Sequence, residues 1–398
     1  MSITPHVDGL KSKLLGRQIY DELYVEDYLA HGSYGAVFRV ADRAGVRQLA
    51  LKVMHRSSQW EEESTLHYFL SNHPNIVTLH ENIELGDYAA SLLDYCPGGS
   101  LHELIYDRCA YAGDSARIKS AFLQIIDAVD HCHTNYVYHR DLKPLNVLCN
   151  EDGSRVFLTD FGLSTRDDAS HEHSRGTVAY MSPGTFSQVR VSRVRAYFLP
   201  ECYREGHSRP KKAPYSPEAN DVWSLGVLFL DLACGERIWE SPTTRDERYR
   251  KFSEDPSTFL RSEYPFNDHA RHLLLRIFSP ELYRIPLKTL REEIRLIDNF
   301  YLSDHEIASA TVQVRRNAIR YGPWTNLAEE DYARLAGVLH GCGVHDFAPN
   351  GDSDESSTEF VEIDLTTPPN EPLHFHSDFI KGEEQPTPWI AELCPSTY

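Results

Sequence analysis

The sequence predicts an α+β fold, in which a small sheet-rich lobe precedes a larger helical lobe. Between residues 20 and 95 the apolar residues come in short runs such as LALKVM, NIVTLHENI and AASLLDY, which are typical of strands. One helix is expected within this region, near residues 60–72. Beyond residue 100 the apolar residues recur at helical spacing instead.

Two segments of the second half predict the main helices of the larger lobe. In residues 114–133 one apolar face is formed at i, i+4, i+7, i+8 and i+11 by Ile118, Phe122, Ile125, Ile126 and Val129. Asp114 or Ser115 can cap the start of this helix. Residues 220–234, NDVWSLGVLFLDLAC, are apolar on nearly all sides and therefore predict a deeply buried helix.

The composition narrows the class of protein. The chain has 398 residues, of which 41% are hydrophobic and 25% charged, as in ordinary globular proteins with a sizeable core. The formal net charge is −19, and residues 351–398 hold eleven Asp or Glu but one Lys. This acidic balance argues against nucleic acid or an anionic membrane as a partner.

Cysteine usage and hydropathy indicate where the protein works. No two of the eight cysteines have CxxC spacing, which argues against a zinc site or a disulfide framework and fits a reducing compartment. We expect no membrane span, because no run of 18 apolar residues exists, and residues 1–15 lack a signal-peptide core. The expected location is therefore the cytoplasm, the nucleus or both.

The C-terminal part has a different character. Residues 350–398 are acidic, polar and punctuated by proline, so we expect a disordered tail there, and we assign no structure to an extension over residues 300–349. Within the tail, VEIDL (361–365) alternates like motifs that add a strand to a partner's sheet, or alternates by chance. Thr367 and Thr387 each precede a proline and are candidate sites for proline-directed kinases.

Four sequence signals follow one another in a fixed order and point to phosphoryl transfer. LAHGSYGAVFRV (29–40) is a glycine-bearing turn between strands, in which Gly32 and Gly35 let the backbone approach phosphates. LALKV then places Lys52 among apolar neighbours. Each of these two signals alone is weak, since most glycine-bearing hairpins are plain turns.

The third and fourth signals are specific. VYHRDLKPLNVL (137–148) carries a carboxylate that can orient a hydroxyl, an ammonium that can meet a phosphoryl group and an amide oxygen that can hold a metal: Asp141, Lys143 and Asn146. LTDFGLS (158–164) supplies Asp160 as a chelator of Mg2+, fourteen residues after Asn146. A chance origin of the whole set is very improbable.

Together these motifs resemble the eukaryotic protein kinase family over residues 20–299. The resemblance implies a bilobal protein kinase fold with an N-lobe at 20–94 and a C-lobe at 95–299, preceded by an extension over 1–19. It implies an ATP-dependent protein serine/threonine kinase that moves the γ-phosphoryl of Mg-ATP to Ser/Thr hydroxyls of protein substrates. The segments HPNIVTLHENIE, DYCPGGSL and NDVWSLGV are most similar to the corresponding sequences of fungal Ser/Thr kinases that control nutrient response and meiotic entry.

The resemblance assigns roles to catalytic residues. Asp141 corresponds to the catalytic base and Lys143 to a phosphate contact, and the form of this loop is that of Ser/Thr kinases. Lys52 corresponds to the lysine that contacts ATP phosphates, paired with Glu63, although Glu61 and Glu62 are close competitors. The remaining assignments are the metal ligands Asn146 and Asp160, and Thr177, which bonds the catalytic Asp and Lys.

The resemblance also implies an ATP site. Leu93 corresponds to the gatekeeper, and backbone groups of Asp94 and Cys96 are expected to bind adenine. The other expected ATP-binding residues are Leu29, Gly32, Gly35, Val37, Ala50, Lys52, Ser100 and Leu148. Ser100 departs from the pattern, because an acidic residue often bonds ribose there, but a hydroxyl can do the same.

Other departures concern regulation and specificity. In the glycine-bearing loop, Ala30 stands where the family usually has a glycine. In the catalytic loop, Leu145 stands where the family usually has a glutamate that binds basic residues of the substrate. An arginine at the position of Arg140 usually forms an ion pair with a phosphorylated residue of the activation loop. Either Ser170 or Ser174 accepts one from an upstream activating kinase, or an acid supplies the charge permanently; the candidate acids are Asp167, Asp168 and Glu172.

The activation segment is interrupted. Such segments end in [AS]PE, but here Ser182-Pro183 runs into Gly184, and PECYREG follows after 17 further residues, 184–200. Glu201 then corresponds to the displaced glutamate, with Arg284 as its expected partner. Three interpretations of residues 184–200 remain open. They are the translation of a retained in-frame intron, a genuine docking or autoinhibitory loop, or no insertion at all, with the end of the activation segment assigned wrongly.

Two functions are therefore compared. The favoured one is an active, monomeric Ser/Thr kinase with ATP and Mg2+ as cofactors, because every catalytic side chain is present. The alternative is a catalytically impaired kinase-fold scaffold that binds ATP and partners, because the insertion stretches the loop that positions the peptide substrate.

Overall fold

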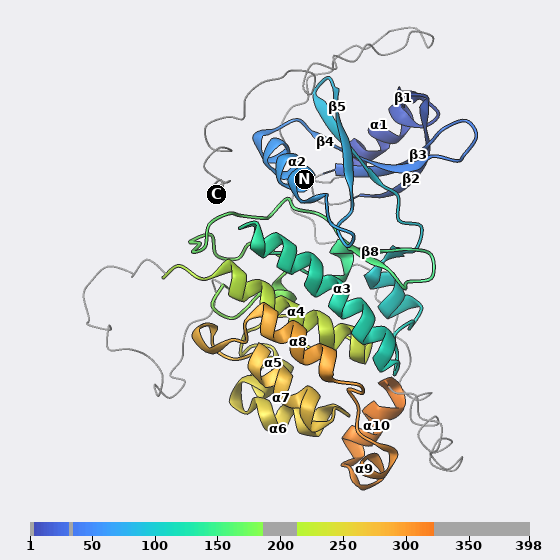
Figure 1. The fold of residues 1–398 in the computed structure, drawn as a ribbon. Coiled ribbons are helices and arrows are strands. Elements are labelled where there is room, and N and C mark those ends of the chain that lie inside the picture. The colour runs from blue at the N-terminus through green and yellow to red at the C-terminus, as the bar shows by residue number, and fades with distance from the viewer. Residues whose placement is uncertain (1–3, 32–34, 186–212, 322–398) are drawn as a thin grey trace, which may run out of the picture. The chain divides into compact units, whose positions relative to one another are not determined.

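The computed structural model describes residues 4–31, 35–185 and 213–321 (Figure 1). These residues divide into two compact units. The sheet unit comprises residues 4–56 with 81–92, and the helical unit comprises residues 57–80 with 93–321. The predicted insertion beyond Thr185 and the acidic tail lie outside the described residues.

A six-stranded sheet dominates the sheet unit, with the strand order β1-β2-β3-β4-β6-β5. The strands are β1 (Gln18–Tyr20), β2 (Leu23–His31), β3 (Gly35–Ala41), β4 (Gln48–His55), β5 (Leu79–Leu85) and β6 (Tyr88–Asp94). The prediction of strands in this region is confirmed, although β5 begins at Leu79 rather than at Asn75. Helix α1 (Thr4–Leu14) was not predicted, and it buries Leu10 and Leu14 in the same apolar core.

The pairing of β3 with β4 separates two faces of the sheet. Ala36, Phe38 and Val40 pair in register with Val53, Leu51 and Leu49, and all six side chains belong to the core of the unit. Because side chains alternate along a strand, the intervening residues of both strands lie on the opposite face. This pattern decides which of the expected ATP-binding residues can share one surface.

The helical unit begins with α2 and contains a second, three-stranded sheet of order β7-β8-β9. Its helices are α2 (Ser58–Leu70), α3 (Ser115–Thr134), α4 (Pro217–Cys234), α5 (Glu247–Glu254), α6 (Pro256–Glu263), α7 (Asp268–Ile277), α8 (Leu287–Leu296), α9 (Asp304–Ser309) and α10 (Val312–Tyr321). Its strands are β7 (Gly99–Ser100), β8 (Val147–Cys149) and β9 (Val156–Leu158), and its short turns of helix are η1 (Glu103–Asp107), η2 (Pro144–Asn146), η3 (Val178–Tyr180) and η4 (Glu281–Tyr283).

The two long helices agree with the sequence predictions. Asp114 caps α3, because its side chain accepts a hydrogen bond from the backbone N–H of Arg117. Nearly every residue of α4 is buried, as its all-round apolar pattern predicted. Helices α4 and α8 both pack against α3 (Figure 1). No helix in the described ranges is long and apolar enough to span a membrane.

The region left unassigned at residues 300–349 contains two further helices in its described part. Ser303 and Glu306 form a capping box at the start of α9. Ile307, Val314 and Ala318 form a small apolar cluster between α9 and α10. The amide of Asn317 donates a hydrogen bond to the carbonyl of Glu263, which attaches α10 to the end of α6.

The close packing of α4 predicts a large effect of one methyl group. A Cβ added at Gly226 would collide with Ile277 and Phe278, whereas a Cβ at Gly9 of α1 meets nothing. Gly226→Ala should therefore lower the free energy of unfolding by about 1–3 kcal/mol, as overpacked cores do. The Gly9→Ala control should be neutral or slightly stabilising. Urea unfolding followed by tryptophan fluorescence measures both, and equal stability of the two variants would contradict the packing.

Candidate active site

The carboxylate of Asp141 is the centre of a hydrogen-bond cluster in the helical unit. Its Oδ1 accepts from the backbone N–H and the hydroxyl of Thr177, both at 2.7 Å. Its Oδ2 accepts from Lys143 Nζ at 2.7 Å and from Asn146 Nδ2 at 3.0 Å. The sequence placed Asp141, Lys143 and Asn146 in one motif, and the family resemblance added Thr177. The structure brings all four together.

The donors around Asp141 fix the orientation of its carboxylate. Lys143 Nζ also donates to the hydroxyl of Thr177 at 2.8 Å, so the three side chains form a closed triangle. Charge-assisted hydrogen bonds of this kind are about twice as strong as neutral ones. Asp141 is therefore a buried, rigidly held acceptor that suits the orientation of a hydroxyl group.

The backbone that carries Asp141 is anchored by a second buried carboxylate, Asp221 of α4. Its two oxygens accept the backbone N–H groups of His139 and Arg140, each at 2.8 Å. Asp221 Oδ2 also lies 3.0 Å from Nε2 of His133 on α3. The side chain of Asp221 is fully buried, so these partners replace the water that an ionised carboxylate requires. The sequence analysis missed this anchor.

Backbone strain marks the same segments. Arg140 and Asp160 have φ values of 65° and 68°, in the left-handed region that costs non-glycine residues energy. Gly176 has a φ of 114°, and a Cβ there would lie 2.5 Å from the carbonyl oxygen of Arg140. Only glycine therefore lets the segment that carries Thr177 approach Asp141 this closely. The only sequence signal for this role was the Gly-Thr dipeptide itself.

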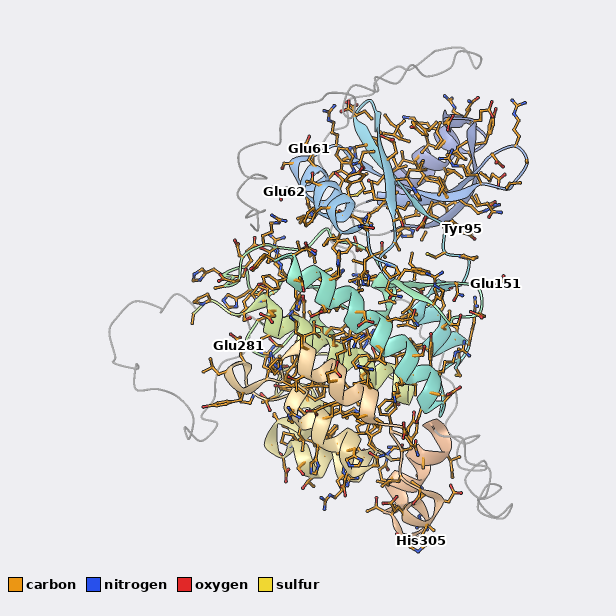
Figure 2. The ribbon with its side chains drawn as sticks, viewed as in Figure 1. Glu61, Glu62, Tyr95, Glu151, Glu281 and His305 are labelled. Atoms are coloured by element: carbon orange, nitrogen blue, oxygen red, sulfur yellow. The ribbon has the colours of Figure 1, made fainter. Side chains whose placement is uncertain are left out.

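Helix α2 distinguishes among its three neighbouring glutamates. Glu63 is buried, whereas Glu61 and Glu62 are exposed, and Figure 2 labels these two on α2. Oε2 of Glu63 lies 2.8 Å from the position that a Cβ on Gly162 would occupy. The helix thus directs Glu63, and neither competitor, toward the segment that contains Asp160.

The two expected metal ligands, Asn146 and Asp160, carry oxygen atoms of the kind that binds a divalent cation. Asn146 uses its amide nitrogen for Asp141, which leaves its amide oxygen available as a ligand. Asp160, two residues after the end of strand β9, supplies a half-buried carboxylate. Oxygen ligands suit Mg2+, which commonly takes one or two side chains and completes its shell with water and phosphate oxygens. The donor set therefore fits Mg2+.

Two expected ATP-site residues meet across a strand pair. Ser100 and Leu148 are register partners of β7 and β8. The Ser100 hydroxyl donates to Oε1 of Glu103 at 2.9 Å, and Oε2 of Glu103 would lie 2.5 Å from a Cβ on Gly99. An exposed carboxylate thus stands beside Ser100, where the sequence analysis saw only a hydroxyl.

The expected adenine-binding residues follow β6. Leu93 is buried, and the side chain of Asp94 contacts His80 at 2.7 Å and the backbone N–H of Thr78 at 3.2 Å. The backbone N–H of Asp94 donates to the carbonyl of Thr78. Burial raises the pKa of the Cys96 thiol to about 12, so this cysteine is a neutral side chain at physiological pH.

The sheet unit carries the remaining expected ATP-site residues. Val37 and Lys52 are register partners, and Ala50 lies two residues before Lys52 on the same strand. These three side chains share the face opposite the core of the unit, since strand neighbours alternate. Leu29 is partly exposed at a register shift in β2.

Glycine is required at Gly35 for a reason that the sequence did not show. A Cβ there would collide with the carbonyl oxygen of Val53 on β4. Gly32 lies outside the described residues. The close approach of Gly35 to phosphates stays a prediction, whereas its close approach to the neighbouring strand β4 is seen in the structure.

Arg140 is bonded to one of the three candidate acids. Its Nη1 lies 2.9 Å from Oε2 of Glu172, and its Nε donates to the carbonyl of Leu163 at 2.6 Å. This hydrogen bond to Arg140 holds the pKa of Glu172 below its usual value. Asp167 and Asp168 are exposed. Glu172 thus occupies the position opposite the arginine.

The two candidate phosphate acceptors differ in accessibility. Ser170 is buried and forms a bridge with Tyr215, with backbone hydrogen bonds in both directions at 2.9 and 3.0 Å. Ser174 is exposed and has a φ of 61°. Of the two, Ser174 is the hydroxyl that another enzyme can reach.

The segment that leads into the insertion, with the first two inserted residues Gly184 and Thr185, is attached to α4 and to residues 174–182. The backbone N–H of Ser182 donates to Oδ1 of Asn220 at 2.9 Å, and the backbone N–H of Ser174 donates to the carbonyl of Thr185 at 2.9 Å. Of the predicted insertion 184–200, the structure describes Gly184 and Thr185. Glu201 lies outside the described residues, so its expected pairing stays a prediction.

Arg284, the expected partner of Glu201, is inserted among backbone carbonyls. Its guanidinium lies over the ring of Trp223, and burial lowers its pKa to about 10. It donates hydrogen bonds of 2.7–3.0 Å to the carbonyls of Ala219, Ile277 and Ser279. Within the described ranges, these carbonyls are its hydrogen-bond acceptors, and no carboxylate forms an ion pair with it.

Known proteins resemble this chain over the same region. The model of the protein kinase domain matches residues 24–284. The "Negative regulator of sexual conjugation and meiosis" of Schizosaccharomyces pombe is 35% identical over 273 residues, which cover 67% of this chain and 57% of that protein. The serine/threonine-protein kinase ksp1 of the same organism is 32% identical, covering 75% of this chain and 60% of that protein.

A budding-yeast protein gives the same picture. The serine/threonine-protein kinase VHS1 of Saccharomyces cerevisiae is 32% identical over 244 residues, which cover 60% of this chain and 50% of that protein. The chain therefore spans between half and three fifths of the length of these relatives. The predicted resemblance to fungal Ser/Thr kinases and the predicted α+β fold are both confirmed.

The anchor at Asp221 predicts a loss of stability when its charge is removed. Asp221→Asn replaces an acceptor oxygen by an amide that faces a backbone N–H, so we expect a loss of about 3 kcal/mol in the free energy of unfolding. Asp127→Asn is the matched control, because Asp127 forms only a partly exposed pair with Arg291 and should cost less than about 1 kcal/mol. Urea denaturation of both variants tests the difference; equal losses would contradict the anchor.

Proposed function

Because the chain belongs to the protein kinase family, we propose that it is an ATP-dependent protein serine/threonine kinase. It transfers the γ-phosphoryl group of Mg-ATP to serine and threonine hydroxyls of protein substrates. The observation that carries this proposal is the hydrogen-bonded set of Asp141, Lys143, Asn146 and Thr177. Since the chain spans only part of its relatives, its substrates and partners are proposed from its own residues.

Asp141 and Lys143 have complementary tasks in the proposed reaction. Asp141 accepts a hydrogen bond from the acceptor hydroxyl and aims its oxygen at the γ-phosphorus. A new oxygen–phosphorus bond forms while the bond from the γ-phosphorus to the bridging oxygen breaks, and ADP leaves with that electron pair. The hydroxyl proton passes to Asp141, and Lys143 stabilises the charge on the transferred group.

Asn146 and Asp160 are the proposed ligands of Mg2+. When bound, Mg2+ neutralises charge on the phosphate oxygens. In the sheet unit, Lys52 is the proposed phosphate contact, and Val37 and Ala50, on the same face as Lys52, are proposed to line the adenine site. The carbonyl of Asp94, the backbone of Cys96 and the side chains of Leu93 and Leu148 are proposed as further adenine contacts.

The pairing of Arg140 with Glu172 supports an enzyme that is active without phosphorylation of its activation segment by an upstream kinase. In the proposed mechanism, a negative charge opposite Arg140 fixes the activation segment relative to Asp141. Glu172 supplies that charge without modification. Phosphorylation of Ser174 remains the proposed alternative route. Within the described residues, Cys96, Cys109, Cys132 and Cys149 form no disulfide bond, which supports the proposed cytoplasmic or nuclear location.

The impaired scaffold remains the second proposed function, because Glu201 and the insertion beyond Thr185 lie outside the described residues. In that function the chain binds ATP and partners but transfers phosphate poorly. The geometry around Asp141 favours the enzyme, since its four hydrogen bonds are complete without Glu201. The two functions predict different activities for the intact chain.

Phosphotransfer from Mg-ATP to a generic Ser/Thr protein substrate separates the two functions. The intact chain should be active, Asp141→Asn should lower kcat by at least about 100-fold, and Asp160→Asn serves as the blank. The chain without residues 184–200 should have a similar kcat. Activity of the deletion alone would support the scaffold and would show that the insertion inhibits. Inactivity of both chains, with folding verified by circular dichroism, would reject the enzyme.

Substitution of Glu172 tests its proposed role as a permanent charge. Glu172→Gln should lower kcat by about three- to tenfold, because the partly exposed ion pair with Arg140 is lost. Ser174→Ala is the control and should retain the wild-type rate. The opposite result, full activity of Glu172→Gln and loss of activity in Ser174→Ala, would show that phosphorylation of Ser174 supplies the charge instead.

A further inference from the structure

Helix α1 precedes the sheet and has no part in the proposed mechanism. It packs against β2 and β3 (Figure 1), and its Leu10 and Leu14 are buried in the core of the sheet unit. The chain that follows it is held by β2, because the backbone N–H of Gly16 donates to the carbonyl of Val25 at 2.8 Å. Burial accounts for the apolar residues of α1, whereas the contact made by its Lys11 calls for another explanation.

Lys11 contacts strand β2 through an aromatic ring. Its Nζ lies 3.7 Å from the centroid of the Tyr28 ring, which is a cation–π contact. The same ring packs edge-on against the buried Phe38, its register partner on β3, with 5.7 Å between the ring centroids. The Tyr28 hydroxyl lies 2.7 Å from Nδ1 of His31. Lys11, Tyr28 and His31 thus form a continuous chain of contacts from α1 to the last residue of β2.

The end of β2 that His31 occupies has little cover from the described residues. Leu29, Ala30 and His31 are all exposed. The pairing of β2 with β3 shifts its register between Tyr28 and Ala30, so the ladder of backbone hydrogen bonds is locally disrupted there. Because neither burial nor a regular ladder fixes this end of the strand, side-chain contacts have a large share in determining its position.

The contacts of Lys11 lie on the face of the sheet that is opposite to Lys52. Phe38 belongs to the apolar core of the unit, and Tyr28 packs against the same core. Lys52 and its register partner Val37 lie on the other face, because side chains alternate along a strand. Lys11 therefore supports the β2–β3 hairpin from the face turned away from the proposed nucleotide contacts, and it can act on a bound nucleotide only through the backbone of the hairpin.

We propose that Lys11 and Tyr28 are positioning residues for the binding of ATP. They hold the end of the β2–β3 hairpin, where Leu29 and Gly35 are expected ATP-binding residues, in the position that the nucleotide requires. The proposal rests on the kinase function proposed above. It deepens that function, because it makes the helix that precedes the sheet a part of the nucleotide site.

The physical basis is preorganisation. A hairpin end that samples several positions has to be ordered when a ligand binds, and the entropy that is lost weakens the binding. Contacts that order the hairpin beforehand remove part of this loss. At a partly exposed site, a cation–π contact is worth about two- to fivefold in an equilibrium constant. Loss of the contact should therefore weaken the binding of ATP and leave the binding of the peptide substrate unchanged.

Lys11→Met, which nearly keeps the length of the side chain but removes its charge, tests the proposal. The KM for ATP and the calorimetric Kd of Mg-ATP should both rise about two- to fivefold. The KM for a degenerate Ser/Thr peptide library and kcat should stay unchanged. Lys11→Arg retains a cation over the ring and should keep the wild-type values. Lys13→Met is the matched control, because Lys13 is an exposed lysine of the same helix, and it should alter neither constant.

Two tyrosine variants separate the contacts on either side of the ring. Tyr28→Phe keeps the ring for Lys11 but removes the hydroxyl that contacts His31, and Lys11→Met should retain its effect in this background. Tyr28→Leu removes the ring and the hydroxyl together, and it should raise the Kd of Mg-ATP at least as much as Lys11→Met. Lys11→Met added to Tyr28→Leu should cause no further increase, because its partner ring is already absent.

Three results would overturn the proposal: an unchanged Kd of Mg-ATP in Lys11→Met, an equal rise of the KM for ATP and the KM for the peptide, or additive effects of Lys11→Met and Tyr28→Leu. Removal of α1 is not a suitable test, because Leu10 and Leu14 belong to the core. If the wild type transfers no phosphate, the proposed function fails, and the calorimetric Kd values decide the positioning role alone. A wild type that binds no Mg-ATP would reject both.

Discussion

The buried carboxylate of Asp221 is the interaction on which the rest of the helical unit depends. It accepts the backbone N–H groups of His139 and Arg140, which immediately precede Asp141. Because buried polar groups must find partners, the buried polar side chains of the otherwise apolar helix α4 specify the positions of other segments. Asn220 holds Ser182, Ser224 holds the backbone of Tyr180, and Asp231 holds the hydroxyl of Tyr180. One helix thereby fixes both the catalytic loop and the segment that follows Thr177.

This arrangement also explains how the strained backbone persists. Left-handed residues such as Arg140 cost about 1–3 kcal/mol each, and they persist only where the surroundings impose them. At Arg140 these surroundings are Asp221 on its backbone and Glu172 and Leu163 on its side chain. The absence of a side chain at Gly176 then allows Thr177 to reach Asp141. The hydrogen bonds of the catalytic cluster are thus a consequence of contacts outside it.

The sequence predicted what depends on residue type and local order. The α+β fold, the buried helix α4, a cap at Asp114 or Ser115 and the grouping of Asp141, Lys143 and Asn146 follow from periodicity and motif spacing. The place of Thr177 beside them came from the family resemblance. The choice of Glu63 over Glu61 and Glu62 needed the orientation of α2, because adjacent helix positions differ by about 100° in direction. The choice of Glu172 among three acids needed the path of an irregular loop. Contacts such as that of Tyr180 with Asp231 join residues 51 apart, and no local pattern encodes them.

The positions of Thr185 and Tyr215, on either side of the stretch that contains most of the insertion, help to decide whether the enzyme tolerates the insertion. Thr185, on one side, accepts a hydrogen bond from Ser174, and Tyr215, on the other side, exchanges backbone hydrogen bonds with Ser170. Both ends are therefore attached to residues 170–174, a segment too short to separate its own ends by more than about 14 Å. When two ends are held this close, additional residues between them add only a slowly growing entropic cost of closure, about 0.6 kcal/mol for each doubling of length. The insertion can therefore lengthen the connection without displacing Thr177 or Asp141, which favours the enzyme over the impaired scaffold on energetic grounds.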